Sequence, residues 1–224
     1  MFLIEEYIEG ELLYDEMNKN NFDQNIMFSV GKKLAELHKF LIKDVWQDKN
    51  KINNKEEWIS SVEKRNKSNL QDLEKNKIVS SNQINFLKEY LNNFLNKLKN
   101  GKVLLCPIHG DYSPKNVLIR GLEVKGIFDF EIHRIAHNLN DLGIVYYWYK
   151  FHDKEKLFLS LLEGYSKIIE VTENEKELIK AYYIMQVIGA ISFLIKENID
   201  KKALIKLKRL LSEFFEQNKN HPEN

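Results

Sequence analysis

The sequence predicts an α+β fold that is mainly helical and contains one small β-hairpin. Long segments repeat apolar residues with helical periodicity, most clearly at residues 81–99 and 201–218. Two short apolar or β-branched runs, residues 117–119 and 124–128, flank a turn at residues 120–123, which is a hairpin signal. The 224 residues are 43% hydrophobic and 30% charged, which is ordinary for a globular chain long enough to bury a good core.

The helical segments follow one another along most of the chain. We expect eight helices, at residues 12–17, 22–42, 56–75, 81–99, 141–151, 154–169, 174–197 and 201–218. His38 lies on the apolar face of the second helix, where a packed and hydrogen-bonded histidine is expected. Gly101 is a typical residue to end the fourth helix. The most apolar segment, residues 182–195, is too short for a membrane span.

The extended segments are shorter and lie near the hairpin or at the N-terminus. Residues 1–9 read as an apolar strand that enters a turn at Gly10, and residues 103–106 as a short strand. Residues 131–140 are expected to form an irregular loop. The last residues, 219–224, are polar and are expected to form a frayed tail.

Composition and charge exclude several classes of function. With 34 basic and 33 acidic residues, the net charge is +1, so we expect neither nucleic acid nor an anionic membrane as a partner. Cys106 is the only cysteine, which excludes a disulfide within the chain and favours a reducing, cytoplasmic location. No histidine or cysteine cluster has zinc spacing, and no signal peptide is recognisable.

The residues that point most directly to chemistry flank the hairpin. Asp111 is followed five positions later by Asn116 and eighteen positions later by Asp129. The hairpin brings the loop before its first strand next to the segment after its second strand, so these side chains should converge. Two carboxylates this close repel by ~4 kcal/mol at an effective dielectric near 20, so they require a divalent cation or a shared proton. The amide oxygen of Asn116 favours the cation, and an all-oxygen set suits Mg²⁺.

The order of these residues is itself informative. The pattern H-x-D-x-x-x-x-N followed by D-F-x, here His109 to Asn116 and then residues 129–131, is typical of phosphoryl-transfer enzymes. In this pattern Asp111 accepts or orients the proton of an attacking hydroxyl, and Asn116 and Asp129 hold Mg²⁺ on the phosphates of ATP. We expect His109 to hydrogen-bond the backbone and shape the loop instead of taking part in the chemistry.

At these residues the chain resembles the aminoglycoside phosphotransferase and choline kinase superfamily, which has a protein-kinase-like fold. The likeness includes the L-A-E-L-H sequence at 34–38, the D-L-G sequence at 141–143 and the hinge-like F-L-I-E-E-Y-I-E-G at 2–10. It covers most of residues 1–150. It implies that residues 11–218 form a helical C-terminal kinase-like lobe, with a catalytic loop at 107–119 and a metal segment at 126–131.

The resemblance also implies roles for residues outside the hairpin. The backbone around Glu6, Tyr7 and Ile8 would meet the adenine ring of ATP, so that residues 1–10 would be the hinge strand remnant of an N-terminal lobe. Asp141 would be a structural anchor for the catalytic loop.

The upstream part of the family pattern is expected to be missing. No G-x-G-x-x-G loop and no V-A-x-K strand precede the hinge-like segment. Two alternatives to a self-sufficient enzyme therefore stay open. One is a non-catalytic kinase-like protein, either a truncated product or a scaffold of the spore-coat type. The other is a half-enzyme whose N-terminal lobe is supplied by a separate chain, which the apolar strand at residues 2–4 would favour.

The expected function is Mg²⁺-dependent transfer of the γ-phosphoryl group of ATP to a hydroxyl of a small molecule. Aminoglycosides, choline or other amino alcohols and homoserine-like compounds are all candidate acceptors. Tyr146 and Trp148 could contribute to a cation–π box, although consecutive aromatic positions cannot all face one pocket and packing is the favoured interpretation. Glu131 is an alternative contact for an acceptor's amino group.

Overall fold

The computed structural model describes residues 7–43 and 55–218. Glu6, residues 1–5 of the expected strand, the polar segment 44–54 and the expected tail 219–224 lie outside the described residues. The helices are Leu13–Glu16 (α1), Ile26–Lys43 (α2), Lys55–Lys75 (α3), Ser81–Asn100 (α4), Leu139–Phe151 (α5), Glu155–Ser166 (α6), Glu173–Glu197 (α7) and Lys201–Asn218 (α8). The strands are Glu11–Leu12 (β1), Leu105–Ile108 (β2), Val117–Arg120 (β3), Glu123–Ile127 (β4) and Arg134–His137 (β5), and a 3₁₀ turn covers Pro114–Asn116 (η1).

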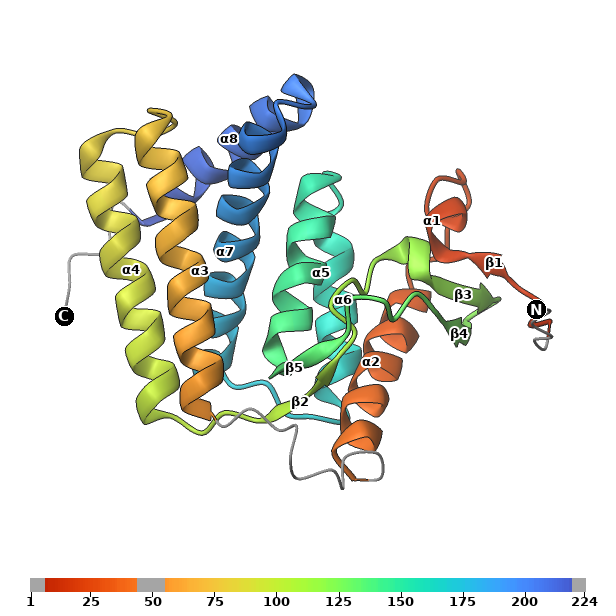
Figure 1. Ribbon diagram of the computed structural model, residues 1–224. Coiled ribbons are helices and arrows are strands. Elements are labelled where there is room, and N and C mark those ends of the chain that lie inside the picture. The colour runs from red at the N-terminus through yellow and green to blue at the C-terminus, as the bar shows by residue number, and fades with distance from the viewer. Residues whose placement is uncertain (1–6, 44–54, 219–224) are drawn as a thin grey trace, which may run out of the picture.

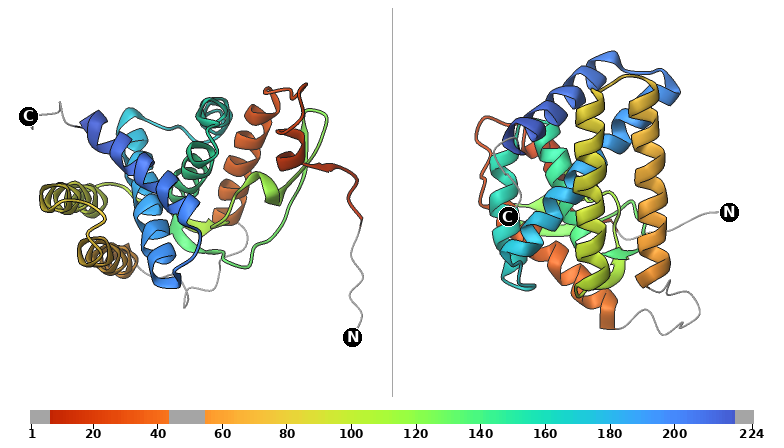
Figure 2. Two further views of the ribbon diagram at one scale, coloured as in Figure 1. Left: turned by 90° about the horizontal axis from the view of Figure 1, so that it is seen from above. Right: turned by 90° about the vertical axis from the view of Figure 1, so that its left-hand side faces the viewer.

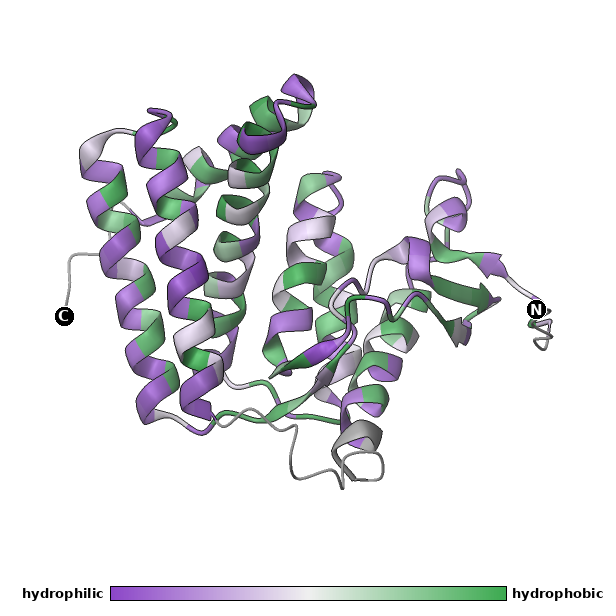
Figure 3. Cartoon of the chain, in the orientation of Figure 1, coloured by the Kyte–Doolittle hydropathy of each residue, from purple (hydrophilic) through white to green (hydrophobic). Residues whose placement is uncertain are grey.

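The arrangement confirms a mainly helical α+β fold (Figure 1). Helices α3 and α4 form an antiparallel pair on one side of α7, and the two views of Figure 2 show the same grouping. An antiparallel sheet of order β1-β3-β4 lies at the opposite end of the molecule from that pair. A second, two-stranded sheet pairs β2 with β5 and lies between the two regions. Figure 3 shows β3 as largely hydrophobic, while α3 and α4 alternate between hydrophilic and hydrophobic residues.

Two expectations, one for a loop and one for a strand, were wrong in detail. Strand β5 lies in the segment 131–140 that was expected to be irregular. Its Ile135 and Ala136 pair with Pro107 and Cys106 of β2. The strand therefore forms because of a partner that is distant in sequence, which the local residue pattern does not indicate. Residues 7–9 are not in a strand, and within the described part of this N-terminal segment, residues 7–12, the pairing with β3 is made by Glu11–Leu12.

Helix α7 is the central helix of the core and contains the apolar segment 182–195. By length and composition, this helix of 25 residues could cross a membrane. It is the one helix in the described part of the chain that meets this test. Most of that apolar window is buried inside the protein, where α7 packs against α3, α5 and α8. The burial is that of a core helix in a globular domain.

Helices α2 and α6 approach so closely that two glycines are required between them. A Cβ on Gly31 would lie 1.8 Å from the carbonyl oxygen of Leu161, and a Cβ on Gly164 would lie 1.9 Å from the carbonyl oxygen of Phe28. Both obstructing atoms belong to the backbone and cannot rotate away. Each helix therefore contributes one glycine to the crossing, and the two backbones are in direct contact there.

Replacing Gly31 or Gly164 by alanine should destabilise the fold by about 3 kcal/mol, because the added methyl group can fit only if the helices separate. Urea unfolding of each variant measures this loss. Gly189→Ala in α7 is the matched control, since its Cβ would meet only the side-chain amide of Asn69 at 3.3 Å. There the better helix propensity of alanine should leave stability unchanged or raise it by up to about 1 kcal/mol. Equal losses at all three positions would contradict the proposed backbone contact.

His137 at the end of β5 is a buried neutral histidine. Its Nδ1 lies 3.0 Å from the hydroxyl of Tyr182, and its ring meets the Trp58 ring edge-on at 6.1 Å between centroids. Burial, with a smaller contribution from the charge of His38, lowers the pKa of His137 from 6.5 to about 3. Protonation of this ring therefore favours the unfolded chain.

The lowered pKa of His137 determines how the stability of the fold depends on pH. Between pH 6.5 and about 3 the unfolded state binds a proton at His137 and the folded state does not. This residue alone should lower the free energy of unfolding by about 1 kcal/mol for each pH unit below 6.5. Urea unfolding of the native protein and of His137→Gln at pH 7.5 and 5.0 measures the difference, and His133→Gln, at an exposed histidine, is the control. Identical pH slopes in all three proteins would exclude this role for His137.

Candidate active site

The loop between β2 and β3 carries Asp111 and Asn116 and is closed by hydrogen bonds between them. The side-chain amide of Asn116 donates to the backbone carbonyl of Asp111 at 2.9 Å and to its Oδ2 at 3.1 Å. The N–H of Ser113 donates to the same carbonyl at 2.8 Å. Because the amide nitrogen of Asn116 is used in this way, its Oδ1 is left as an acceptor for another group. Asn116 is buried, whereas Asp111 is half-buried and reaches solvent.

His109 ties this loop to the segment that follows the hairpin. The N–H of Asp111 donates to Nδ1 of His109 at 3.2 Å, and Nε2 of His109 lies 2.9 Å from the carbonyl oxygen of Phe128. This pattern requires the ring proton to be on Nε2, from which it is donated to Phe128. The fully buried ring therefore contacts backbone on both sides, as expected from the sequence for a residue that shapes the loop.

Asp129 is brought to this loop by the hairpin. Val117 pairs with Ile127, and the N–H of Phe128 donates to the carbonyl of Asn116 at 3.1 Å. Asp129 is the next residue after this last hydrogen bond to the loop. Its φ is +65°, the left-handed conformation that aspartate and asparagine tolerate better than most residues. The carboxylate is exposed and makes no hydrogen bond or ion pair with the described residues.

The donor set of Asn116 and Asp129 fits a hard cation such as Mg²⁺. Within residues 7–43 and 55–218, no three histidine, cysteine, aspartate or glutamate side chains are grouped to hold a metal by themselves. An amide oxygen and one or two carboxylates are the usual protein share of a Mg²⁺ site, in which water and phosphate oxygens supply the remaining ligands. Asn116 Oδ1 and the unpaired carboxylate of Asp129 are such donors.

Asp141 at the start of α5 is a buried anchor of the loop between β2 and β3. Its carboxylate accepts the backbone N–H of His109 at 2.8 Å and that of Gly110 at 2.9 Å. It also lies 3.0 Å from Nε2 of His38 in α2. The second ring nitrogen of His38 lies 2.9 Å from the hydroxyl of Tyr165 in α6. The loop is thus connected through one carboxylate to three helices.

The ionised form of Asp141 is the one that these contacts favour. Burial acts to raise its pKa, but the hydrogen bond and charge of His38 and the N–H groups of Gly110 and His109 outweigh burial. The pKa of Asp141 is therefore lowered from its ordinary value. A carboxylate with a lowered pKa stabilises the fold at neutral pH and loses that contribution only in strong acid.

The remaining residues expected at the site are spread around it. Glu131 is exposed two positions after Asp129, and Tyr7 and Ile8 are exposed ahead of β1. Tyr146 packs on Phe158 and Tyr183, with ring centroids 4.6 and 4.9 Å away.

Trp148 lies in a different cluster from Tyr146. Its ring stacks on His152 at 4.1 Å and meets the Tyr14 ring edge-on at 6.2 Å. The two aromatic side chains share no ring partner among the described residues, so they do not form a common box. The Tyr14 ring is in turn 5.2 Å from Nζ of Lys115 in the catalytic loop, so Trp148 lies nearer to that loop than the sequence could show.

Sequence reasoning missed Arg134, because the segment around it was expected to be an irregular loop. The structure places its guanidinium against Gly110, where a Cβ would lie 2.9 Å from Nη1. The sequence predicted that His38 is packed and hydrogen-bonded, which the structure confirms, but it did not identify Asp141 as the partner. The L-A-E-L-H sequence was the available signal for His38, and none was available for Arg134.

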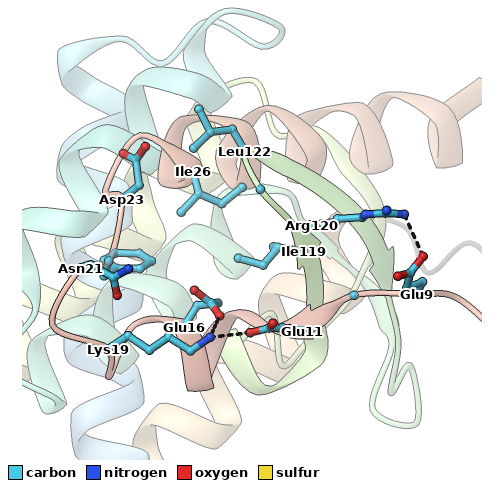
Figure 4. Close-up of a pocket in the computed structure, with 13 residues that line it drawn as sticks. Glu9, Glu11, Glu16, Lys19, Asn21, Asp23, Ile26, Ile119, Arg120 and Leu122 are labelled. Atoms are coloured by element: carbon cyan, nitrogen blue, oxygen red, sulfur yellow. Dashed lines mark hydrogen bonds and ion pairs between the residues drawn. The ribbon is translucent and has the colours of Figure 1, made fainter.

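Two surface cavities lie away from these residues. One of about 560 Å³ is enclosed by β1, the β3–β4 turn and the segment between α1 and α2 (Figure 4). Most of its charged side chains are paired with one another: Lys19 contacts Glu11 and Glu16, and Arg120 contacts Glu9. Asp23 also lines the cavity and accepts the backbone N–H of Asn25. A second of about 830 Å³ lies at the α5–α6 turn. Neither is lined by the three predicted catalytic and metal-binding residues.

The family model described as "Phosphotransferase enzyme family" matches residues 1–178. No curated protein sequence matches the chain significantly. Among solved structures, the fold is similar to the GDP complex of aminoglycoside 2'-phosphotransferase-IIIa, with a TM-score of 0.64 and 13% identity. It is also similar to a choline/ethanolamine kinase family protein from Mesorhizobium loti, with a TM-score of 0.63 and 14% identity. A third is amicoumacin kinase hAmiN in complex with AMP-PNP, Ca²⁺ and Ami, with a TM-score of 0.58 and 14% identity.

These structures are longer than the present chain. The matches cover 95%, 93% and 88% of this chain, but 69%, 66% and 61% of the three structures in the same order. At these identities the likeness establishes the shared fold.

Replacing Asp141 by asparagine should destabilise the protein by roughly 3 kcal/mol. One carboxylate oxygen, which now accepts hydrogen bonds, would become an amide nitrogen that faces the same N–H donors and cannot accept from them. Asp153→Asn is the matched control, since Asp153 is exposed and its ion pairs with Lys206 and Arg209 lie at the surface. That change should cost less than about 1 kcal/mol. Urea unfolding at pH 7.5 measures both, and a similar small loss at the two positions would rule out the anchoring role.

Proposed function

The chain belongs to the phosphotransferase enzyme family, and from that membership we propose that it transfers the γ-phosphoryl group of ATP to a hydroxyl group of a small molecule. The observation that carries the proposal is a pair of hydrogen bonds made by the backbone of Phe128. Its carbonyl accepts from His109 and its N–H donates to Asn116, which joins the loop of Asp111 to the segment of Asp129. This arrangement supports the proposal, because phosphoryl transfer depends mainly on the positioning of the reacting groups.

Asp111 would orient the acceptor. Its Oδ2 accepts the amide of Asn116, while its Oδ1 has no partner among the described residues and reaches solvent. The acceptor oxygen would attack the γ-phosphorus as the bond from that phosphorus to the β-phosphate oxygen breaks. ADP would leave with the bonding electrons, and the hydroxyl proton would pass to Asp111.

Asn116 Oδ1 and the carboxylate of Asp129 would hold Mg²⁺ on the nucleotide phosphates. The bound ion would neutralise charge that develops on the phosphate oxygens. Asn116 would have two roles, because the same side chain fixes the Asp111 carboxylate through its nitrogen. The backbone of residues 6–8 would meet the adenine ring, as in the family pattern.

The choice of acceptors to test follows from the similar structures. The names of similar structures include kinases of aminoglycosides, of amicoumacin and of the choline/ethanolamine family. Aminoglycosides, amino alcohols and homoserine-like compounds therefore remain the acceptors to test. Glu131, which is exposed and unpaired among the described residues, would receive an amino group of such a compound.

A further part of the protein would also need to cover the bound nucleotide near the hairpin. Ile8, Phe128, Phe130 and Ile132 are exposed apolar side chains next to the candidate site. Such a surface favours contact with a further lobe, supplied by the same polypeptide or by a separate chain.

ATP with Mg²⁺ should stabilise the protein against heat by about 2.7 kcal/mol at a nucleotide concentration 100 times the Kd. Asp129→Ala should lose the part of the shift that requires Mg²⁺. Asp111→Asn should keep the shift but lower phosphoryl transfer at least ~100-fold, because the general base contributes 10²–10⁴-fold. Asp15→Asn, at an exposed position on α1, is the control. A Mg²⁺-dependent shift that survives Asp129→Ala would count against this site.

A further inference from the structure

Lys115, in the loop between β2 and β3, points away from the groups that would hold the metal ion. It is exposed and directly precedes the buried Asn116 in the 3₁₀ turn η1, where successive side chains diverge by about 120°. Asn116 turns toward Asp111, whereas the ammonium group of Lys115 lies 5.2 Å from the centre of the Tyr14 ring in α1. Lys115 pairs with no carboxylate in the described part of the chain, so its charge is left for another partner.

Aromatic rings continue from Tyr14 to the C-terminal end of α5. The Tyr14 ring meets the Trp148 ring edge-on at 6.2 Å, and the Trp148 ring stacks on His152 at 4.1 Å. All three side chains are partly exposed. In Figure 1, α1 and the C-terminal end of α5 both lie above the sheet of β3 and β4. The rings therefore form one continuous aromatic surface that begins at the loop of Asp111.

Lys154 lies at the other end of this aromatic surface. It follows His152 by two residues, and its ammonium group donates to the carbonyl of Met17 at 2.7 Å and to Oδ1 of Asn18 at 3.4 Å. Both acceptors are neutral and come directly after α1. The end of α5 is thus joined to α1 at two places, and the ammonium group of Lys154 lies at one of them. Like Lys115, it has no carboxylate partner among the described residues.

Positive charge dominates around the His152 ring. Its pKa is lowered by burial and then by three positive charges, those of Lys206, Lys115 and Lys154. Asp153 acts in the opposite direction, but its two carboxylate oxygens already contact Lys206 and Arg209, each at 2.6 Å. Cations beside partly buried rings attract an anion more strongly than they would in bulk water, because the local dielectric is lower. Ammonium groups bind carboxylate and phosphate oxygens through charge-assisted hydrogen bonds.

We propose that Lys115, His152 and Lys154 bind an anionic group, a carboxylate or a phosphate, carried by the hydroxyl acceptor. The rings of Trp148 and Tyr14 would form the apolar wall beside it. The inference rests on the proposed function and narrows its acceptor to hydroxy acids, hydroxy amino acids or phosphorylated alcohols.

The direction of Lys115 favours the acceptor over the nucleotide as the source of the anion. Asn116 would present its Oδ1 to the metal ion and the nucleotide phosphates, and the neighbouring Lys115 side chain points elsewhere. The amide nitrogen of the same Asn116 holds the carboxylate of Asp111. A hydroxyl group at Asp111 and an anion at Lys115 would therefore belong to one small molecule.

The anion site can be tested without turnover. Thermal unfolding is followed with inorganic phosphate against sodium chloride at equal ionic strength, in the native protein and in Lys115→Gln and Lys154→Gln. Phosphate should raise the Tm of the native protein, and each variant should lose most of that rise relative to its own Tm in chloride. Lys64→Gln, at an exposed lysine of α3, is the matched control and should keep the rise. No rise in the native protein, or equal rises in all four proteins, would overturn the site. A rise that ATP with Mg²⁺ abolishes would also overturn it, because the lysines would then serve the donor.

The His152 ring gives a second readout that a merely structural role would not change. The charged groups that act on it are Lys115 from η1, Lys206 from α8, and Asp153 and Lys154 from the α5–α6 turn. A bound anion opposes the three ammonium charges and favours the protonated ring, so phosphate should raise the pKa of His152. NMR titration of the ring with and without phosphate measures this, and an unchanged pKa would exclude His152 from the site.

The substrate class is tested with three related acceptors, using the full protein, ATP and Mg²⁺. Glycerol is compared with glycerate, which carries a carboxylate, and with glycerol 3-phosphate. One of the two anionic compounds should have a lower KM than glycerol. Lys115→Gln should raise that KM roughly ten- to hundredfold, with a smaller change in kcat. Lys115→Arg should retain most of the affinity, because the positive charge is kept. An equal effect of Lys115→Gln on all three acceptors would overturn the assignment.

The failures of the two proposals are distinguishable. Transfer to uncharged or cationic acceptors that Lys115→Gln leaves unchanged would keep the proposed function and overturn the anionic acceptor. Phosphate binding that needs both lysines, without transfer to any acceptor in the presence of bound nucleotide, would overturn the proposed function and with it the assignment of the anion to an acceptor.

Discussion

The buried carboxylate of Asp141 holds together parts of the chain that have no other reason to meet. It accepts two consecutive N–H groups of the catalytic loop and contacts the ring of His38 in α2. Through His38 the same contact reaches Tyr165 in α6. An isolated charge in this position would be costly, and only the full set of donors makes it favourable. The loop geometry is therefore set by the helical core, and the position of Asp111 is fixed by contacts made at the residues before it.

The helices and the hairpin could be predicted because their signals are local. Apolar periodicity defines α4 and α8, and the turn between two β-branched runs defines the β3–β4 hairpin. The closeness of Asp111, Asn116 and the segment of Asp129 followed from the hairpin alone. Strand β5 could not be predicted, because its partner β2 lies more than twenty residues earlier and its own residues have no clear alternation. Arg134 was missed for the same reason, since its place beside Gly110 depends on the pairing of β5 with β2.

Charge is divided by sign around the proposed base. The carboxylates of Asp129 and Glu131 follow the hairpin, while the guanidinium group of Arg134 lies against Gly110, the neighbour of the proposed base. A net charge of +1 gives no hint of this division, because the two signs cancel over the whole chain.

The glycine contact between α2 and α6 also constrains how the chain can fold. Gly31 lies near the start of the sequence and Gly164 in its last third, so their contact closes a loop of more than half the chain. During synthesis, the apolar stripe of α2 would remain uncovered until α6 had left the ribosome. Contacts of such long sequence separation slow folding and prolong the exposure of apolar surface. The same close fit that makes the finished core rigid leaves α2 of the nascent chain dependent on α6, and α2 would stay accessible to chaperones until α6 has been made.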